Sequence, residues 1–215
     1  MNIKVKKRNG RLEDFIVDKI NASSLRACEG IEDVSPSEIV LDAQLQLFDK
    51  ITTREIDQAL IFSAREKIEK EPNYSFAAAG LLLNTLYKEV FKEGVDSDTF
   101  KLQYRKSFIQ NTKKLVKENR LDSRLLDFDL PALSEAMKIS RDKNLKYLGV
   151  QILYDRYFIR LDNKIMEAPQ SFFMRVAMGL SINEDNKTEK AIEFYELISQ
   201  QPYTPSTPKG VRSKD

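Results

Sequence analysis

The first residues of the chain alternate between apolar and polar side chains. Ile3 and Val5 are separated by a lysine, and Leu12 begins a second short run after the pair Asn9-Gly10. Alternation with a period of two is typical of a strand with one buried face. An Asn-Gly pair between two such runs favours a tight turn, because both residues tolerate positive φ. The pattern predicts a β-hairpin at the N-terminus.

After the hairpin, apolar positions recur every three or four residues, which is typical of amphipathic helices. Asp18 is expected to cap the first of them. Two further helix starts have the form of a capping box, in which a hydroxyl residue precedes a glutamate by three positions. A fourth helix is expected over about 73–92, where a run of small residues would let a neighbouring helix approach closely. The boxes are Ser35-Pro36-Ser37-Glu38 and Thr52-Thr53-Arg54-Glu55, and the small run is Ala77-Ala78-Ala79-Gly80.

Helical spacing continues through most of the remaining chain. The exception is 156–165, where alternation around Asp162-Asn163 predicts a short pair of strands. The last fifteen residues hold three prolines and are not expected to form a packed element. The sequence therefore predicts a mainly α fold in three parts, which are a hairpin with four helices (1–92), a helical region (93–200) and a Pro-rich tail (201–215).

Composition removes several classes of chemistry. The chain has no histidine, which excludes Ser-His-Asp and Cys-His catalysis and the usual zinc sites. Its one cysteine, Cys28, excludes an internal disulfide and is expected to be a small buried hydrophobe. The chain has 35 lysine and arginine residues and 33 aspartate and glutamate residues. The resulting net charge of +2 argues against a nucleic-acid partner.

Targeting signals and glycine-rich loops are also missing from the sequence. It has no apolar run long enough to span a membrane and no N-terminal signal peptide, so we expect a cytoplasmic protein without a membrane partner. A nucleotide, if bound, would not be held by a Gly-rich loop. The remaining candidate is the cluster Lys6-Lys7-Arg8 beside the Asn9-Gly10 turn. Those cations suit a polyphosphate, or they form a charged edge that prevents strand aggregation.

The hairpin sequence resembles a known family. Residues 5–13, Val-Lys-Lys-Arg-Asn-Gly-Arg-Leu-Glu, followed by Asp18-Lys19-Ile20, are similar to the opening of the ATP-cone, V-x-K-R-[DN]-G-x-x-E…[FL]-D-K-I. This is the small allosteric domain at the N-terminus of ribonucleotide reductase large subunits. Further matches follow in order at Glu29-Gly30, Ile51-Thr52-Thr53, Asp57, Pro72-Asn73-Tyr74, Ala77-Ala78-Ala79 and Lys88.

The resemblance continues beyond the cone. Glu167-Ala168-Pro169-Gln170 with Arg175-Val176-Ala177 is similar to an E-x-P-Q…R-V-A signature of the large subunit, and Pro205-Ser206-Thr207-Pro208 is similar to the segment that enters its ten-stranded α/β barrel. The specific family is the class I enzyme, which acts on ribonucleoside diphosphates and makes deoxyribonucleotides for DNA synthesis.

The resemblance implies a site for ATP or dATP as an allosteric effector. Glu13 would contact the adenine edge and Asp57 would lie near the ribose. For Val5 and Ile20, which would form apolar walls of the site, simple core packing is an alternative to ligand contact. For Thr53, the alternative to phosphate contact is a role at the N-terminus of a helix. Two positions depart from the family pattern. Ile16 stands where the family has a polar residue, and Thr85 stands where it has a histidine. The phosphate contacts would fall on Lys7, Arg8, Thr53 and Lys88, and the apolar walls on Val5 and Ile20.

The family's catalytic cysteines have no counterpart here, so no catalytic residue is expected in this chain. Only Ser206 and Thr207 would approach the substrate diphosphate. The resemblance implies a partner chain with the barrel and redox cysteines, and a small subunit that holds the radical cofactor. The alternative is a free-standing nucleotide-sensing module. Four aromatic residues are expected to pack against the missing barrel, namely Phe172, Phe173, Tyr195 and Tyr203.

Overall fold

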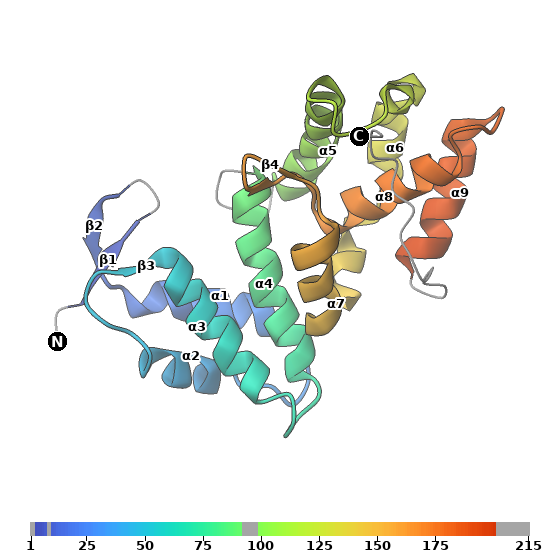
Figure 1. The fold of residues 1–215 in the computed structure, drawn as a ribbon. Helices are drawn as coiled ribbons and strands as arrows, with labels where there is room; N and C mark the ends of the chain where they lie inside the picture. Colours follow the sequence, from blue (N-terminus) through green and yellow to red (C-terminus); the bar gives the residue numbers. More distant parts are fainter. Residues whose placement is uncertain (1–2, 8–9, 92–98, 201–215) are drawn as a thin grey trace. The chain divides into compact units, whose positions relative to one another are not determined.

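The computed structural model describes residues 3–7, 10–91 and 99–200 (Figure 1). The chain divides into two compact units, of which the first comprises residues 1–85 and 143–152 and the second comprises 86–142 and 153–215. Helix α4 (Tyr74–Phe91) contributes residues to both units. The domain boundary expected at residue 92 and the tail 201–215 lie outside the described residues.

The first unit contains a small sheet and helices. Strand β1 (Lys4–Lys6) lies in the middle of the sheet, antiparallel to β2 (Leu12–Asp14) and parallel to β3 (Ile51–Thr52). The hairpin and the four helices that the sequence predicts are therefore present, whereas β3 was not predicted. The helices are α1 (Val17–Cys28), α2 (Pro36–Gln44), α3 (Thr53–Glu66), the first part of α4, and α7 (Tyr147–Ile152).

Two of the predicted helix starts are confirmed by their hydrogen bonds. The Ser35 hydroxyl accepts the N–H of Glu38 at 3.3 Å, and Thr52 and Glu55 form a complete capping box. The prediction that Asp18 caps α1 is wrong. The helix begins one residue earlier, and its N-cap Ile16 provides no side-chain hydrogen bond. Asp18 lies instead in the first turn, where its charge interacts favourably with the helix dipole.

Helices α1 and α4 make a close backbone contact in the first unit. A methyl group at Gly80 would lie 3.1 Å from the carbonyl oxygen and 3.2 Å from the Cα of Ala27. The small residues of α4 therefore allow the close approach that the sequence predicts. Cys28, the next residue on α1, is buried, and burial raises the pKa of its thiol to about 11. The expectation of a small buried hydrophobe at Cys28 is confirmed.

The second unit is built mainly from helices α5, α6, α8 and α9. The predicted strand pair is confirmed over 160–165 as β4 and β5, and both turn residues between them, Asp162 and Asn163, have positive φ. Residues 156–157, which were expected to begin this pair, belong instead to a π-helical turn. The elements outside the first unit, apart from the end of α4, are α5 (Phe100–Lys117), a 3₁₀ helix (Ser123–Asp127), α6 (Leu130–Ala136), a second 3₁₀ helix (Ile139–Asn144, whose last two residues belong to the first unit), a π-helical turn (Leu153–Tyr157), β4 (Arg160–Leu161), β5 (Lys164–Ile165), α8 (Pro169–Leu180) and α9 (Lys187–Ser199).

A buried ion pair connects the segment between β5 and α8 with α8 itself. The Arg175 guanidinium donates to both oxygens of Glu167, and the side chains of the two residues are only 5% and 6% exposed. The Ile159 N–H donates to the same carboxylate at 2.9 Å. Buried charges need partners of this kind, because removing one member leaves the other uncompensated. The signature motif around 167–177 is therefore explained by packing within this unit.

Two of the aromatic residues expected to face a missing barrel are buried within their own unit. Phe172 contacts Phe158 and Phe173 edge to face, and Tyr195 is completely buried. The expectation is wrong for these two because the unit supplies its own aromatic partners. Phe173 is half-buried. Tyr203 lies outside the described residues.

A hydrogen-bond network around Asp142 lies at the centre of the second unit. Tyr87 and Tyr104 donate to its Oδ2 at 2.6 and 3.0 Å, and the Gln170 side-chain amide donates to Oδ1 at 2.8 Å. Tyr195 donates in turn to the Gln170 oxygen at 2.6 Å. Because these residues come from four helices and the carboxylate is 2% exposed, the network links α4, α5, α8 and α9 through one buried charge.

Burial raises the pKa of Asp142 to about 6, although its three hydrogen bonds act in the opposite direction. The pKa of an unfolded aspartate is near 4. The folded protein therefore binds this proton more tightly than the unfolded chain. The resulting stabilisation is complete below pH 4 and is lost as the pH rises to about 6. A shift of this size corresponds to at most about 3 kcal/mol.

We expect Asp142→Asn to remove this contribution to the pH dependence. Urea unfolding of the full chain at several pH values between 4 and 7 measures it, with the slope of stability against pH as the readout. The variant is also expected to be less stable overall, since its amide nitrogen replaces an acceptor facing Gln170. If wild type and variant show the same slope, Asp142 does not titrate in this window.

Candidate functional site

The candidate site lies on one face of the hairpin. Side chains alternate across a strand, so Val5 and Lys7 project to the same face, and Glu13 pairs directly opposite Val5. The hairpin loop is closed by hydrogen bonds from the Gly10 N–H to the Lys7 carbonyl and from the Lys7 N–H to the Arg11 carbonyl, at 2.9 and 2.8 Å. Three of the predicted site residues therefore lie together by virtue of strand register.

The Glu13 carboxylate lies between two ammonium groups. Its Oε2 atom is 3.7 Å from the Nζ of Lys7 and 3.7 Å from the Nζ of Lys19. All three side chains are between 34% and 59% exposed, so each ion pair contributes little to stability. The group carries two positive charges and one negative charge at the surface. Lys19 was not singled out from the sequence, although it lies in the Asp18-Lys19-Ile20 segment that carries the resemblance.

The N-terminus of α3 adjoins this hairpin face. Parallel pairing places Thr52 beside Lys6, so Thr53, the first residue of α3, follows next to Lys7. A helix N-terminus exposes backbone N–H groups and a positive dipole end, both of which favour an anion. The Glu55 carboxylate accepts from the Thr52 N–H and hydroxyl at 2.7 Å each, and these bonds lower its pKa. Asp57 lies one turn further along α3 and is half-buried.

The two predicted apolar walls belong to the core of the first unit. Val5 and Ile20 are each 6% exposed and lie in one cluster with residues of the sheet and of the surrounding helices. Core packing, the alternative that the sequence left open, accounts for both. Their contact with a ligand stays a prediction.

The remaining predicted residues lie outside the described part of the first unit. Lys88 lies on the part of α4 that belongs to the second unit. Arg8, Ser206 and Thr207 lie outside the described residues. Of the two positions that depart from the family pattern, Ile16 is exposed and Thr85 is buried, with its hydroxyl donating to the Leu81 carbonyl at 3.3 Å.

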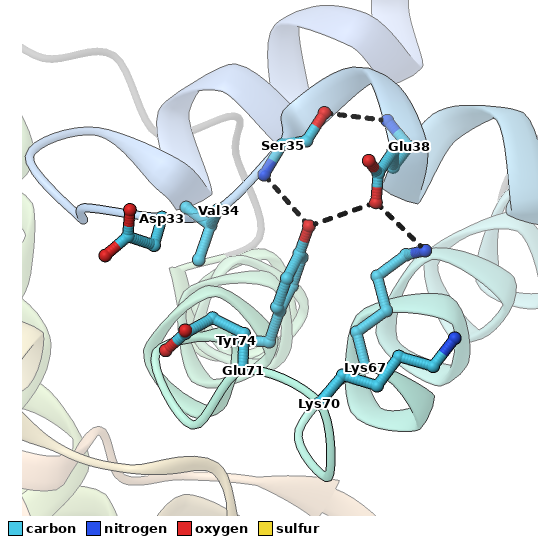
Figure 2. A pocket seen from close by; sticks show the side chains of 8 residues that line it. All are labelled: Asp33, Val34, Ser35, Glu38, Lys67, Lys70, Glu71 and Tyr74. Atoms are coloured by element: carbon cyan, nitrogen blue, oxygen red, sulfur yellow. Dashed lines mark hydrogen bonds and ion pairs between the residues drawn. The ribbon is translucent and has the colours of Figure 1, made fainter.

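A pocket of about 430 Å³ lies elsewhere in the first unit, and none of the predicted site residues lines it. Figure 2 shows the Tyr74 hydroxyl between the Ser35 N–H, which donates to it at 3.0 Å, and the Glu38 carboxylate, which accepts from it at 3.4 Å. The lining residues come from the loop before α2, the start of α2, the segment after α3 and the start of α4, and are Asp33, Val34, Ser35, Glu38, Lys67, Lys70, Glu71 and Tyr74.

One of the two lysines of this pocket, Lys67, is already paired with carboxylates. The Lys67 ammonium lies 2.8 Å from Asp42 and 3.3 Å from Glu38, and the hydrogen bond to Asp42 is the main reason why its pKa is raised. Three carboxylates and two lysines line the pocket, so it offers no excess of positive charge. It is therefore less suited to a polyphosphate than the hairpin face is.

Metal-binding clusters and membrane-spanning helices are both absent from the described residues. In residues 3–7, 10–91 and 99–200, no group of three or more cysteine, aspartate or glutamate side chains is arranged to hold a metal ion. No helix within the same residues is both long enough and apolar enough to cross a membrane.

Comparison with known proteins gives two family matches. Residues 3–89 match the ATP cone domain, and residues 143–209 match the family described as ribonucleotide reductase, all-alpha domain. The first match covers the hairpin, α1, α2, α3 and most of α4. The second begins with the segment 143–152 of the first unit and continues through α8 and α9.

Individual relatives agree with these matches. The chain is 38% identical over 211 residues to the ribonucleoside-diphosphate reductase subunit alpha of Chlamydia trachomatis and 39% identical over 208 residues to that of Helicobacter pylori. It is 32% identical over 209 residues to the large chain of Schizosaccharomyces pombe. These alignments cover 95–96% of the chain but only 20–25% of each relative. The chain thus spans a fifth to a quarter of their length.

The arrangement at the hairpin predicts that Glu13 competes with anions for Lys7 and Lys19. In Glu13→Gln, both ammonium groups lose their carboxylate partner while the shape of the side chain is kept. We expect the affinity for inorganic tripolyphosphate to rise about threefold to tenfold, as measured by titration calorimetry at low salt.

Asp14→Asn is the matched control for this experiment. Asp14 lies next to Glu13 but faces the other side of the strand, where it pairs with Lys4. Both substitutions raise the net charge by one, and only the change at Glu13 is expected to strengthen binding. An equal gain in the two variants would show a general charge effect and no anion site on this face.

Proposed function

We propose a function for this chain on the basis that it belongs to the family of ribonucleotide reductase large subunits and corresponds to their N-terminal part. It is the effector-binding part of a ribonucleoside-diphosphate reductase. The effector would be ATP or dATP, bound at the hairpin. The observation that carries this proposal is the pair of lysines around Glu13 beside the N-terminus of α3. Cations beside the positive dipole end of a helix are an arrangement that suits a nucleotide polyphosphate.

Each predicted site residue has a role in this proposal. Lys7 and Thr53 contact the phosphates, and Lys19 joins them. Asp57 lies near the ribose. On binding, the phosphates replace the Glu13 carboxylate as partner of the two lysines, which releases that carboxylate to accept a hydrogen bond from the adenine amino group. Further phosphate contacts are assigned to Arg8 and Lys88, and apolar contacts to Val5 and Ile20.

The effector acts by favouring one state of the reductase over another. A ligand shifts such an equilibrium only by the difference between its affinities for the two states, which is typically about 1–3 kcal/mol for allosteric coupling. The part of the chain that binds the effector therefore need not contain any catalytic group.

The hairpin assignment predicts the effect of removing its polar groups. We expect Lys7→Ala to weaken ATP binding about tenfold or more, since a charge-assisted hydrogen bond is lost, and Thr53→Ala to weaken it several-fold. Titration calorimetry with the full chain measures both affinities, and thermal unfolding checks that the variants are folded.

Lys70→Ala is the control for this experiment, because Lys70 lines the pocket of Figure 2 in the same unit. Its affinity for ATP should equal that of wild type. If Lys70→Ala lost more affinity than Lys7→Ala, the effector site would lie in the pocket and the hairpin assignment would be wrong.

We further propose that the chain works in an assembly. Cys28 is its only cysteine, and the buried thiol with a raised pKa is a poor candidate for radical or redox chemistry. A separate chain would carry the catalytic barrel and the redox cysteines, and a small subunit would hold the radical cofactor. In this proposal, residues 1–92 are the cone, 93–200 support the barrel, and 201–215 lead towards it, with Ser206 and Thr207 near the substrate diphosphate.

Co-purification from the native host tests the proposed assembly. The tagged chain should recover a chain with a cysteine-bearing barrel, and the complex, supplied with the radical-generating small subunit, should reduce a ribonucleoside diphosphate. Cys28→Ala should leave that activity unchanged, because the reacting thiols lie on the partner chain. Recovery of the chain without any barrel-bearing partner, and without activity, would support a free-standing nucleotide sensor instead.

A further inference from the structure

Helix α5 carries an unusual concentration of positive charge. Its eighteen residues include six basic and no acidic side chains. Among the described residues, Arg105 alone of these six has an ion-pair partner, Glu135, whose carboxylate lies 2.5 Å from its guanidinium. The other five are exposed and form no ion pair with any described residue, and they are Lys101, Lys106, Lys113, Lys114 and Lys117.

Three of these lysines form a line along the helix. Tyr104, Phe108, Thr112 and Leu115 are buried and define the side of α5 that faces the core. Residues 102, 106, 109, 113 and 117 recur every three or four positions on the opposite side. That line holds three lysines with Leu102, which is 68% exposed, and the half-buried Ile109. We call these five residues the α5 face.

Several basic residues elsewhere in the second unit are paired, unlike the lysines of the α5 face. Elsewhere in the second unit, Arg124, Arg141, Lys187 and Lys190 each lie within 3.4 Å of a carboxylate oxygen. On α5, by contrast, Lys113 and Lys117 are four residues apart, a spacing at which like charges destabilise a helix. The family matches cover 3–89 and 143–209, so neither of them includes α5.

We propose that the α5 face is a docking surface for an acidic amphipathic helix of a partner polypeptide. On an α-helix, Lys106 and Lys117 are separated by about 16 Å along the axis. An antiparallel helix would match the three lysines with three carboxylates. The first would face Lys117, the second, four residues later, would face Lys113, and the third, seven residues beyond the second, would face Lys106. An apolar residue between the last two carboxylates would cover Ile109, and another four residues beyond the third carboxylate would cover Leu102.

The composition of the face favours a polypeptide over a nucleic acid. Proteins that bind single-stranded nucleic acids stack bases on exposed aromatic side chains, and the α5 face contains none. The aromatic residues Tyr104 and Phe108 are buried on the other side of the helix. The exposed Leu102 and the half-buried Ile109, on the same line as the lysines, instead suit the apolar stripe of a docked helix. The inference is independent of the proposed nucleotide site.

A labelled synthetic peptide tests the inference. The probe is a helical peptide with three glutamates at the spacing described above and leucines on the same face, and its binding to the full chain is followed by fluorescence anisotropy. We expect saturable binding to wild type that weakens with added salt. Charge reversal in Lys106→Glu with Lys113→Glu should weaken it about tenfold or more.

The matched control reverses two exposed lysines elsewhere in the second unit, Lys138→Glu with Lys164→Glu. Its affinity should stay within about twofold of wild type, because its net charge equals that of the α5 variant and only the location differs. Urea unfolding verifies that both variants are folded.

Three outcomes would overturn the inference. The first is no saturable binding of the glutamate peptide, or equal binding of a peptide with glutamines in place of its glutamates. The second is an equal loss of affinity in the two double variants, which would show a general charge effect. The third is tighter binding of an oligothymidylate or of anionic phospholipid vesicles than of the peptide, which would assign the face to a different polyanion.

Discussion

Strand β1 is only three residues long, yet it has hydrogen-bonding neighbours on both sides. Its pairing with β2 sets Glu13 opposite Val5, and its pairing with β3 sets the start of α3 beside Lys7. Without this strand, the hairpin lysines and the N-terminus of α3 would have no fixed relation to each other. The capping box of Thr52 and Glu55 then begins α3 directly after the paired residue, so no loop intervenes between the sheet and the helix.

In the second unit, the corresponding constraint is electrostatic. A carboxylate that is buried this deeply needs several donors, and Asp142 obtains them from Tyr87, Tyr104 and Gln170. Burial holds the pKa values of both tyrosines well above the usual range, so their hydroxyls stay protonated and available as donors. Because the donors belong to three different helices, the position of each helix depends on the same carboxylate.

The features that could be predicted from the sequence are those determined by residues close together in the chain. The capping box of Thr52 and Glu55, the N-cap at Ser35, the hairpin around Gly10 and the turn at Asp162-Asn163 each depend on a few adjacent side chains, although the predicted box at Ser35 is incomplete because the Ser35 N–H donates to Tyr74. Strand β3 depends on Val5 and Ile51, which are far apart in the sequence, and the hydrogen bond between Tyr87 and Asp142 spans 55 residues. The charged hairpin residues could be predicted from the motif, whereas the position of Lys19 beside Glu13 depends on how the start of α1 lies against the hairpin.

The contact between α1 and α4 has a practical consequence for following the first unit. Cys28 is the chain's single thiol, and it is buried on α1 next to Ala27, where Gly80 of α4 lies against the backbone. Alkylating reagents react with the thiolate, which is scarce at neutral pH when the pKa is about 11. Reaction therefore requires α1 to separate from its neighbours, so the native cysteine serves as an internal reporter of local opening, without an introduced label.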